Sequence, residues 1–416
     1  MQENINANSM TLSEELAWRG LIHQTTFKDI KYIDENKLTI YHGFDASADS
    51  QTIGNLASMV VDLCFLRHGH KAIILAGGAT SLIGDPGGRD KERPMQTVEA
   101  IGANVEAAKK QIQKIYGAYD FTLVNNLDWT QKIDAISFLR DIGKYFNVGE
   151  MIKTEYVASR LGEGGAGISF TEFSYALLQG YDFLHLYDTY GCTLQLCGSD
   201  QWTNCLAGVD LIRKKRGIET NVLTNPLIIN KSTGIKFGKS EAGAVWLDAA
   251  KTSPFDFYQF WLNTDDESAQ DYTKIFTPIQ KPEFAALLES FNADRSTRLL
   301  QKYLAFETTK LVHGVEAAKE AEQKSVKIYE EGGLENATEI KVEAVLISEN
   351  KINIVELMLA ANIVDSKGKA KDLISGGGVY LNEEKVEEVE QDNPKMAGKD
   401  IILRVGKKKY YKIISE

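Results

Sequence analysis

The stretch that decides the fold is residues 41–56, which read YHGFDASADSQTIGNL. The residues 38–41 that lead into it predict a short strand, and the apolar residues from Ile53 onward predict a helix. A strand, a polar turn with glycine and a helix N-terminus together form a site for phosphate and ribose. A second stretch, Ile235-Lys236-Phe237-Gly238-Lys239-Ser240, places two lysines on a loop of small residues. The two stretches predict a nucleotide site over which the lysine loop closes.

The composition is that of a globular protein with more than one domain. The chain has 416 residues, of which 43% are apolar and 25% are charged, and no apolar run approaches a membrane span. The segment Met1–Met10 is polar and lacks the apolar core of a signal peptide. We therefore expect a cytoplasmic protein without membrane association, divided into two or three domains.

The four cysteines and the net charge narrow the function classes. None of Cys64, Cys192, Cys197 and Cys205 forms a CxxC pair, so we expect packed, reduced thiols and no bound structural metal. The net charge of -11 argues against a general nucleic-acid binder, although a local basic face would suffice. Candidate basic clusters are residues 213–216, the series 367/369/371 and residues 407–409. For any one cluster, a solvated surface is the simpler interpretation.

Strand and helix patterns alternate through the first half of the chain. Strands are predicted at 71–76, 121–125 and 193–197, with helices at 98–116, 170–179 and 204–216. This alternation favours an α/β fold with a doubly wound, Rossmann-like parallel sheet. Residues 11–36 are predicted to be helical.

The second half of the chain changes character. From about residue 248 to 331 the pattern is helical, and a linker with Gly332 and Gly333 runs to Glu339. A small α+β unit follows, with helices near 352–361 and 365–375 and strands at 379–381, 400–405 and 409–414. We predict three domains, an α/β domain over 1–247, a helical domain over 248–335 and a small α+β module over 345–416.

Five motifs in fixed order carry a family resemblance. They are YxGFDxxADSxxIGxL, GGATxLIGDPxGxxxER, GISFTEFSYxLLQGYDFLxL, LQxxGSDQWxN and KFGKS, spanning residues 41–240, with similarity continuing to Gly314. On these motifs the chain resembles the bacterial-type tyrosyl-tRNA synthetases, a family of class I aminoacyl-tRNA synthetases. The LLQGYDF and GSDQW strings separate it from the tryptophan-specific relatives. The resemblance implies a tyrosine–tRNA ligase that uses Mg-ATP, L-tyrosine and tRNA(Tyr) and forms a homodimer. It also implies that the domain over 1–247 is catalytic and includes a dimer-interface insertion, that the helical domain over 248–335 binds the anticodon, and that the module over 345–416 binds RNA.

The resemblance also implies roles for individual residues. The phenol hydroxyl of tyrosine would meet Tyr41 and Asp182, the α-ammonium would meet Asp85, Tyr175 and Gln179, and Gln201 would lie near the carboxylate. The adenylate would be lined by Gly43, Asp45, Gly54, Gly198, Asp200 and Lys239. The groups that would act on the phosphates are Ser47, Thr52, Asn55, Arg89, Arg93, Lys236, Lys239 and Ser240.

These roles agree with elementary chemistry. Attack of a carboxylate on the α-phosphorus of ATP needs no protein nucleophile, so catalysis depends on positioning and on stabilising phosphate charge. A phenol donates one hydrogen bond and accepts another, which an Asp and a Tyr hydroxyl can match. Tyr175, Gln179 and Asp182 are spaced i, i+4 and i+7 and share one helix face. That pattern also fits an ordinary amphipathic helix with a polar stripe.

The sequence departs from the family at its first signature. The usual His-Ile-Gly-His is Thr52-Ile53-Gly54-Asn55 here, Ser47 stands where Thr is frequent, and His42 stands where Cys is frequent. Asn55 keeps an amide donor for a ribose or phosphate oxygen, whereas Thr52 offers only a hydroxyl. Reduced adenylation and compensation by Arg89, Arg93 and the lysine loop both remain open.

The C-terminal stretch 363–382 resembles a small RNA-binding module that a ribosomal protein shares. Lys369 and Lys371 on its helix would bind tRNA phosphates, which gives affinity without sequence readout. Two rival hypotheses remain at this point. One is an RNA-binding synthetase paralogue impaired in adenylation by Thr52 and Asn55. The other is an enzyme for a different aromatic amino acid, which we would expect to alter Tyr41 or Asp182.

Overall fold

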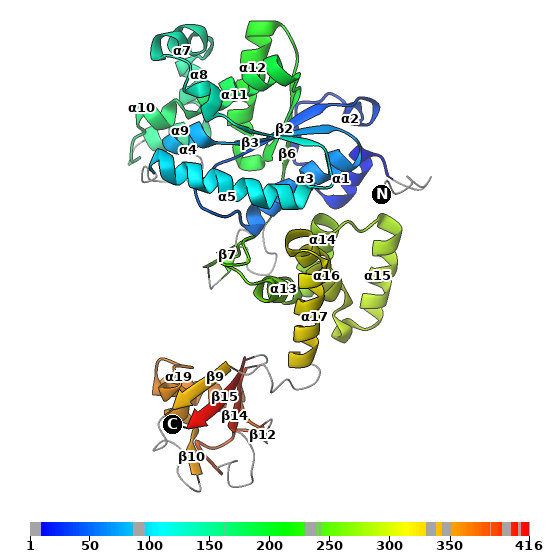
Figure 1. Ribbon diagram of the computed structural model, residues 1–416, viewed down its shortest axis with the longest axis vertical. Coiled ribbons are helices and arrows are strands. Elements are labelled where there is room, and N and C mark those ends of the chain that lie inside the picture. The colour runs from blue at the N-terminus through cyan, green and yellow to red at the C-terminus, as the bar shows by residue number, and fades with distance from the viewer. Residues whose placement is uncertain are drawn as a thin grey trace. The chain divides into compact units, whose positions relative to one another are not determined.

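The computed structural model describes residues 10–85, 96–162, 164–228, 239–240, 243–329, 338–342, 351–382, 384–392, 401–406 and 409–415. The chain divides into two compact units, residues 1–319 and 320–416 (Figure 1). The predicted α/β fold class is confirmed. The three-domain division with boundaries at 247, 335 and 345 stays a prediction.

The first unit is built on a six-stranded sheet with the order β1-β6-β5-β2-β3-β4. The strands from β6 to β4 run parallel to their neighbours, and only β1 is antiparallel to β6. Such a sheet brings the carboxyl ends of its parallel strands to one edge, where ligands bind in α/β proteins. The strands are β1 Gln24–Thr25, β2 Thr39–Phe44, β3 Lys71–Ala76, β4 Phe121–Asn125, β5 Leu194–Gly198 and β6 Asn221–Asn225.

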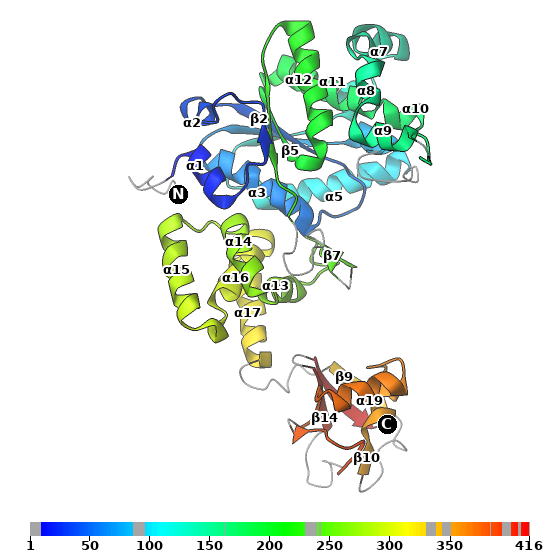
Figure 2. The ribbon, with the colours of Figure 1, turned by 180° about the vertical axis from the view of Figure 1, so that it is seen from behind.

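Helices cover both faces of this sheet (Figures 1 and 2). On β2, Tyr41 packs toward α11 and α12, whereas the next residue, His42, contacts Asp62 of α3, because successive strand side chains point to opposite faces. The helices of this region are α1 Leu12–Arg19, α2 Tyr32–Glu35, α3 Ile53–Arg67, α4 Gly78–Ile83, α5 Val98–Tyr116, α6 Leu127–Thr130, α7 Ala135–Asp141, α8 Val148–Ile152, α9 Glu155–Leu161, α10 Phe170–Phe173, α11 Tyr175–Tyr190 and α12 Trp202–Arg216.

A helical region follows the sheet and is joined to it by a buried arginine. Arg19 of α1 is 1% exposed and donates to the backbone carbonyls of Thr277 at 2.8 Å and Ile279 at 3.1 Å, and to Glu15 at 2.8 Å. Burial alone would raise the pKa of Glu15, but hydrogen bonds and charges from surrounding cations hold that pKa well below its usual range. The helical elements are α13 Pro254–Leu262, α14 Asp266–Phe276, α15 Lys281–Ala293, α16 Leu299–His313 and α17 Val315–Tyr329.

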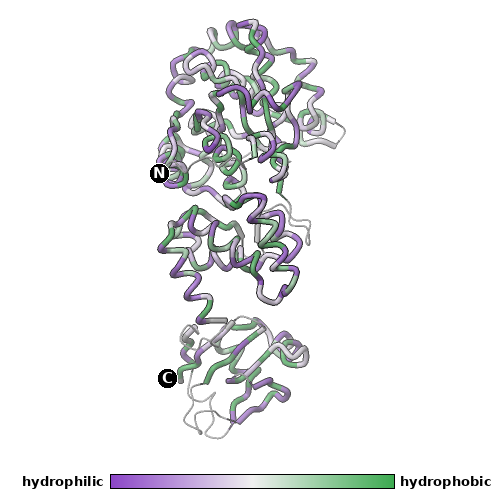
Figure 3. Tube along the Cα trace, turned by 90° about the vertical axis from the view of Figure 1, so that its right-hand side faces the viewer, coloured by the Kyte–Doolittle hydropathy of each residue, from purple (hydrophilic) through white to green (hydrophobic). Residues whose placement is uncertain are grey.

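The second unit contains the small α+β module. Its main sheet has the order β12-β11-β14-β15-β9, and buried apolar residues of β9, β11, β14 and β15 share one core. Hydrophobic stretches recur along the trace of this unit (Figure 3). The helices α18 and α19 pack against the same core. The elements are β9 Thr338–Val342, β10 Lys351–Asn353, α18 Ile354–Ala360, α19 Lys367–Ser375, β11 Val379–Leu381, β12 Glu384–Lys385, β13 Glu390–Asp392, β14 Ile401–Val405 and β15 Lys409–Ser415.

Two local predictions are wrong, and for the same reason. Residues 11–36 are not continuously helical, because α1 ends at Gly20 in a left-handed conformation and β1 pairs with β6 instead. Residues 338–342 were expected to begin as linker but form β9, which pairs in parallel with β15. The strands β1 and β9 both pair with strands that are distant in the sequence, so a local sequence pattern does not predict them.

Candidate active site

Buried polar side chains lie where β2 packs against α11. Tyr41 is 1% exposed, its ring lies 5.2 Å from that of Phe183, and its hydroxyl has no hydrogen-bond partner among the described residues. Burial, with added repulsion from negative groups including Asp182, raises the pKa of Tyr41 well above its usual value. The hydroxyl therefore keeps its proton at neutral pH. A buried polar atom without a partner is costly, so this hydroxyl is suited to meeting a ligand.

Asp182 on α11 is 2% exposed and is held by two side-chain donors. The amide Nδ2 of Asn126 donates to its Oδ2 at 2.9 Å, and the indole Nε1 of Trp129 donates to its Oδ1 at 2.9 Å. Burial raises the pKa of Asp182 to about 7, although these two hydrogen bonds oppose the shift. Each carboxylate oxygen retains a free lone pair, so Asp182 can still accept from a phenol.

Asn126 and Trp129 were not predicted from the sequence. They follow β4 and lie in and beside the short helix α6, and Trp129 stacks on His185 of α11 with ring centroids 4.3 Å apart. The string that carries them shows no periodicity or glycine turn that would mark it as part of a site. Their role becomes visible only when the fold brings α6 against α11.

A further buried amide lies beside Tyr41. Gln195 of β5 is in register with Tyr41 on the neighbouring strand, and its Oε1 has no partner among the described residues. Strand residues in register point to the same face of the sheet. Gln195 therefore adds a second polar group that could bind a ligand, on the same face of the sheet as Tyr41.

The residues predicted for the tyrosine backbone lie in two contacting groups. Tyr175, at the start of α11, donates to Asp45 at 3.4 Å, and Thr80 of α4 donates to the same carboxylate oxygen at 3.3 Å. In the second group, Gln201 donates to Asp85 at 2.6 Å.

The fourth residue of this set contacts a thiol instead. The amide of Gln179 donates to the sulfur of Cys205 at 3.6 Å. Asp45, Asp85, Tyr175 and Gln201, which come from four separate segments, are thus paired across the carboxyl ends of the strands.

The turn after β2 is fixed by amides of α5 that the sequence did not reveal. Asn104 donates to the carbonyl of Ala46 at 2.9 Å, and Gln111 accepts from the backbone N–H of Gln51 at 2.9 Å. Asn104 and Gln111 are seven residues apart, which places both on one face of α5. That spacing is the signal that could have identified them.

Close backbone approach explains two glycines of the site. A Cβ at Gly78 would lie 2.2 Å from Oδ1 of Asn125, and a Cβ at Gly198 would lie 2.6 Å from Oδ1 of Asp200. Among the other predicted adenylate residues, Gly43 lies in β2 and Gly54 lies in the first turn of α3. These glycines leave little side-chain volume at the strand ends and at the start of α3, where the nucleotide is expected to bind.

Thr52 and Asn55, the two residues that depart from the usual signature, contact each other at the start of α3. Oδ1 of Asn55 accepts from the backbone N–H of Thr52 at 3.0 Å and from the Thr52 hydroxyl at 2.9 Å. Neither side chain is buried.

The segment that follows the lysine loop is paired with this signature. Ile53 donates its N–H to the carbonyl of Val245 at 3.1 Å, and Leu247 donates to the carbonyl of Gln51 at 2.9 Å. Thr52 forms a bridge with Trp246 between these two bonds. An ion pair between Lys251 and Asp49 adds a side-chain contact. The backbone of the signature is therefore fixed to the segment 245–251.

The lysine loop itself is described only in part. Lys239 and Ser240 form β7, which makes a hairpin with β8, Gly243–Ala244. Lys236, Arg89 and Arg93 lie outside the described residues. Ser47 lies in the turn after β2, where its carbonyl accepts from Gln96 at 3.0 Å.

His42 forms a hydrogen bond with the buried carboxyl group of Asp62. Its Nδ1 lies 2.6 Å from Oδ2 of Asp62 on α3, and the hydroxyl of Tyr116 on α5 donates to the same oxygen at 2.7 Å. Burial would lower the pKa of His42, but the charge and hydrogen bond of Asp62 outweigh it and raise that pKa. Asp62 and Tyr116 are further residues that local sequence patterns did not single out.

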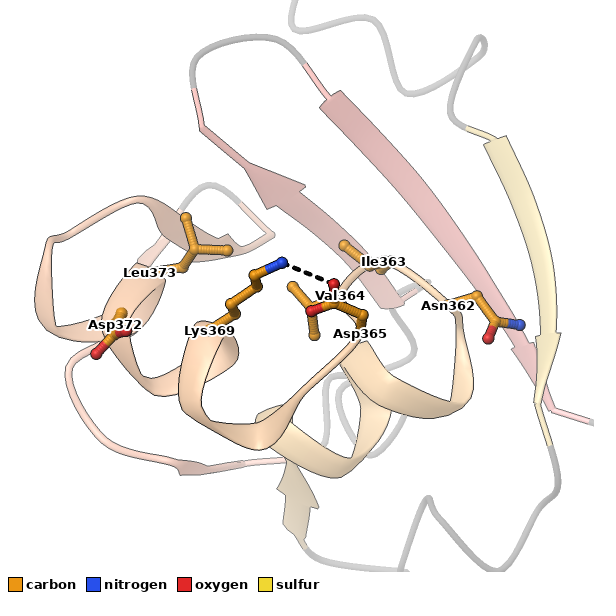
Figure 4. A pocket seen from close by; sticks show the side chains of 7 residues that line it. All are labelled: Asn362, Ile363, Val364, Asp365, Lys369, Asp372 and Leu373. Atoms are coloured by element: carbon orange, nitrogen blue, oxygen red, sulfur yellow. Dashed lines mark hydrogen bonds and ion pairs between the residues drawn. The ribbon is translucent and has the colours of Figure 1, made fainter. Parts of the chain in front are cut away.

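The candidate RNA-binding lysines lie on α19 of the module. Lys369 makes an exposed ion pair with Asp365 at 2.6 Å, and Lys371 is exposed. A hollow of about 680 Å³ lies beside this ion pair (Figure 4). The residues that line it are Asn362, Ile363, Val364, Asp365, Lys369, Asp372 and Leu373.

The basic cluster at residues 213–216 is partly neutralised by two aspartates. Arg213 and Lys214 pair with Asp210, and Arg216 pairs with Asp188 at 2.6 Å. This agrees with a solvated surface. In the part of the chain that the structure describes, no group of three His, Cys, Asp or Glu side chains is arranged to hold a metal ion. The described helices include none with the length and apolarity needed to cross a membrane.

Comparison with known proteins places this site in a family. Residues 34–330 match the family described as tRNA synthetases class I (W and Y), and residues 334–413 match the tyrosine–tRNA ligase SYY-like C-terminal domain. The first match covers well over half of the chain. The chain belongs to the class I tRNA synthetases of the W and Y type.

Similar proteins point to the tyrosine branch of that family. The chain is 43% identical to a tyrosine–tRNA ligase of Bacillus caldotenax, over 97% of this chain and 99% of the relative. It is 43% identical to that of Limosilactobacillus reuteri, with the same coverage. A C-terminally truncated mitochondrial tyrosyl-tRNA synthetase from Aspergillus nidulans superposes with a TM-score of 0.70 at 31% identity, over 79% of this chain and 97% of that one.

A more distant structure shares the fold alone. The tyrosyl-tRNA synthetase of Archaeoglobus fulgidus, complexed with L-tyrosine, superposes with a TM-score of 0.54 at 15% identity, over 75% of this chain and 99% of that one. The recognition of the family from its five motifs is confirmed by the family match over residues 34–330 and by the 43% identical tyrosine–tRNA ligases.

Proposed function

We propose that this chain is a tyrosine–tRNA ligase that first joins L-tyrosine to ATP as tyrosyl-adenylate and then transfers the tyrosyl group to tRNA(Tyr). The observation that carries the proposal is that the Tyr41 hydroxyl and the Asp182 carboxylate are both buried on elements that pack against each other. A phenol placed between them donates to Asp182 and accepts from Tyr41. An indole lacks an oxygen that could accept from Tyr41, and a phenyl ring offers neither contact.

In the first step a carboxylate oxygen of tyrosine attacks the α-phosphorus of ATP. A new C–O–P linkage forms as the bond to the pyrophosphate oxygen breaks, and pyrophosphate leaves. The protein positions the reactants and stabilises charge on the departing phosphates. We assign positioning of the ammonium group to Asp85, Tyr175 and Gln179, and of the carboxylate to Gln201.

The nucleotide end of the same step uses a second set of residues. The ribose and adenine side of the adenylate is assigned to Gly43, Asp45, Gly54, Gly198 and Asp200. Phosphate stabilisation is assigned to Lys239, aided by Ser47, Ser240, Asn55 and, outside the described residues, Lys236, Arg89 and Arg93. Mg²⁺ enters with ATP as part of that substrate, bound by its phosphate oxygens.

In this proposal the module and the helical region bind the tRNA. Lys369 and Lys371 contact backbone phosphates, so binding weakens as salt concentration rises. The acceptor end of the tRNA must reach the adenylate while the rest of the RNA is held elsewhere. In the transfer step a ribose hydroxyl at the 3' end of the tRNA attacks the carbonyl carbon of the adenylate. An ester bond forms as the bond between that carbon and the phosphate oxygen breaks, AMP leaves, and the hydroxyl proton passes to solvent.

We further propose that the chain works as a cytoplasmic homodimer. Helices α7 to α10 carry apolar side chains that are unusually exposed, including Phe170 at 74% and Ile136 at 71%. Such a concentration of exposed apolar side chains is typical of protein interfaces. The others on these helices are Leu139, Val148, Ile152 and Leu161.

The proposal is tested by isolating the intermediate. The full chain is incubated with labelled tyrosine, Mg-ATP and pyrophosphatase and passed through a gel-filtration column. We expect about one label per active site to elute with the protein and to move to tRNA(Tyr) when that RNA is added. Bound tRNA with no labelled intermediate would instead support an RNA-binding paralogue that has lost adenylation.

A further inference from the structure

The altered signature at the start of α3 contains an internal hydrogen-bonded pair. Oδ1 of Asn55 accepts two hydrogen bonds from Thr52, one from the backbone N–H at 3.0 Å and one from the hydroxyl at 2.9 Å. An N–H can only donate, so the atom of Asn55 that meets it must be the oxygen. The orientation of the amide is therefore fixed by chemistry.

This orientation leaves the Asn55 NH₂ group as the outward donor. The side chain of Asn55 is exposed, and no described residue accepts from its Nδ2. Phosphate and ribose oxygens of a bound nucleotide are acceptors, and an amide N–H is the group they require. An Asn55 with the opposite orientation would present its oxygen to them and repel them.

The same geometry limits what Thr52 can do directly. A threonine hydroxyl carries a single proton, and here that proton is donated to Asn55. A phosphate oxygen cannot donate in return, so Thr52 cannot bind it while the bond to Asn55 persists. The backbone of Thr52 is in turn held by its bridge to Trp246 and by neighbouring bonds to the segment 245–247.

We propose that Thr52 is a positioning residue that acts through Asn55, so that the pair works as one donor in place of two separate signature side chains. Thr52 aligns the amide of Asn55 before ATP binds, and the amide then donates to a nucleotide oxygen as phosphate charge develops. This inference rests on the proposed adenylation function and concerns how its nucleotide end is built. It accounts for a signature that has lost both of its usual imidazoles.

A double-mutant cycle tests the proposal on the full chain. The single-turnover rate of tyrosyl-adenylate formation is measured at saturating tyrosine and ATP for the native protein, Thr52→Val, Asn55→Ala and the double variant. Thr52→Val keeps the side-chain shape and the backbone N–H bond, so we expect a loss of about three- to tenfold. Asn55→Ala removes the donor itself, and we expect a loss of about 10²-fold.

The interaction between the two substitutions in the double variant decides whether the proposal holds. In the Asn55→Ala background, Thr52→Val should change the rate by less than about twofold, because Thr52 then has nothing to align. Losses that multiply in the double variant would overturn the proposal and show that Thr52 acts on ATP independently. Thr52→Ser restores the donated proton and should recover most of the rate that Thr52→Val loses.

Two controls separate this role from general stability and from the wider proposal. Thr11→Val makes the same substitution at the start of α1, where the Thr11 side chain accepts a hydrogen bond from the backbone N–H of Glu14. This variant should leave the adenylation rate unchanged. The dissociation constant of tyrosine should be the same in all variants, since the pair does not touch the phenol pocket. Tyrosine-dependent adenylation by the native protein tests the proposed function separately from the cycle.

Discussion

The two ends of the candidate active site are built in opposite ways. The amino-acid end is buried, and its central acid, Asp182, is held by Asn126 and Trp129 before any ligand arrives. At the end that we propose for phosphate, Thr52 is half-buried and Asn55 is exposed, and the assigned donors are these short side chains and the lysines of the loop. The first arrangement suits selection of a substrate, and the second suits charge that appears only during the reaction.

Physical chemistry explains why the difference is useful. In a buried pocket a wrong ligand leaves polar groups unpaired, and each such group costs about 1–3 kcal/mol, which favours the correct amino acid. At the phosphate end, a donor that binds ATP tightly in the ground state would not accelerate the reaction. A contact that strengthens in the transition state raises the rate instead. We therefore expect substitutions at the two ends to change different kinetic constants.

The largest effect should come from Asp182→Ala. It removes the acceptor for the phenol and strands the Trp129 indole and the Asn126 amide. We expect kcat/KM for tyrosine to fall by about 10³-fold, chiefly through KM. Steady-state adenylation assays measure this, with thermal unfolding as a check on folding. A fall confined to kcat would argue against ground-state selection at this end.

Lys239→Ala should cost less and act differently. The lysine is assigned to the leaving pyrophosphate, so its loss should lower the adenylation rate by about 10²-fold. The dissociation constant of tyrosine should change by less than about twofold, since the lysine is assigned to pyrophosphate and not to the amino acid. Stopped-flow fluorescence yields both constants. Weakened tyrosine binding as the main consequence would show that the lysine has another role.

Tyr41→Phe should narrow selectivity without abolishing activity. The hydroxyl has no described protein partner, so its removal leaves nothing stranded in the free protein. We expect the tyrosine-to-phenylalanine ratio of kcat/KM to fall by about tenfold. Parallel pyrophosphate-exchange assays with the two amino acids give this ratio. An unchanged ratio would remove Tyr41 from the phenol site.

The raised pKa of Asp182 predicts a pH-dependent stability. Burial lifts this pKa from 3.8 to about 7, so between those values the folded protein holds a proton that the unfolded chain has lost. The free energy of unfolding therefore falls as pH rises through that window. Asp182→Asn does not titrate, so the stability of the native protein relative to this variant should decline from pH 4 to pH 7. Urea unfolding of both proteins checks the sign, and a constant difference would contradict it.

The smallest effect on adenylation should come from the module. Replacing Lys369 and Lys371 together with Glu should weaken tRNA binding and flatten its dependence on salt. Neither residue belongs to either end of the tyrosine and ATP site, so pyrophosphate exchange should be unchanged. Filter binding across a salt series and exchange assays report the two properties separately. Impaired exchange would mean that the module influences the chemistry.

The sequence predicted the strands, helices and motif residues of the site better than the residues that hold these motif residues in place. Strands at 71–76 and 121–125 and the helix at 98–116 agree with β3, β4 and α5, because their apolar patterns are local. Tyr41 and Asp182 were found because they lie in recognisable motifs. Asn126, Trp129, Asp62 and Gln195 were missed, since their importance arises from segments that meet only in the folded chain.

The most direct test of the account is tyrosine-dependent exchange of pyrophosphate into ATP by the purified full chain. Tyrosine, phenylalanine and tryptophan are compared at equal concentrations with Mg-ATP and labelled pyrophosphate. The account predicts rapid exchange with tyrosine and, without a phenol to pair Tyr41 and Asp182, exchange lower by at least about 10²-fold with the other two. No exchange with tyrosine, or equal exchange with phenylalanine, would contradict it.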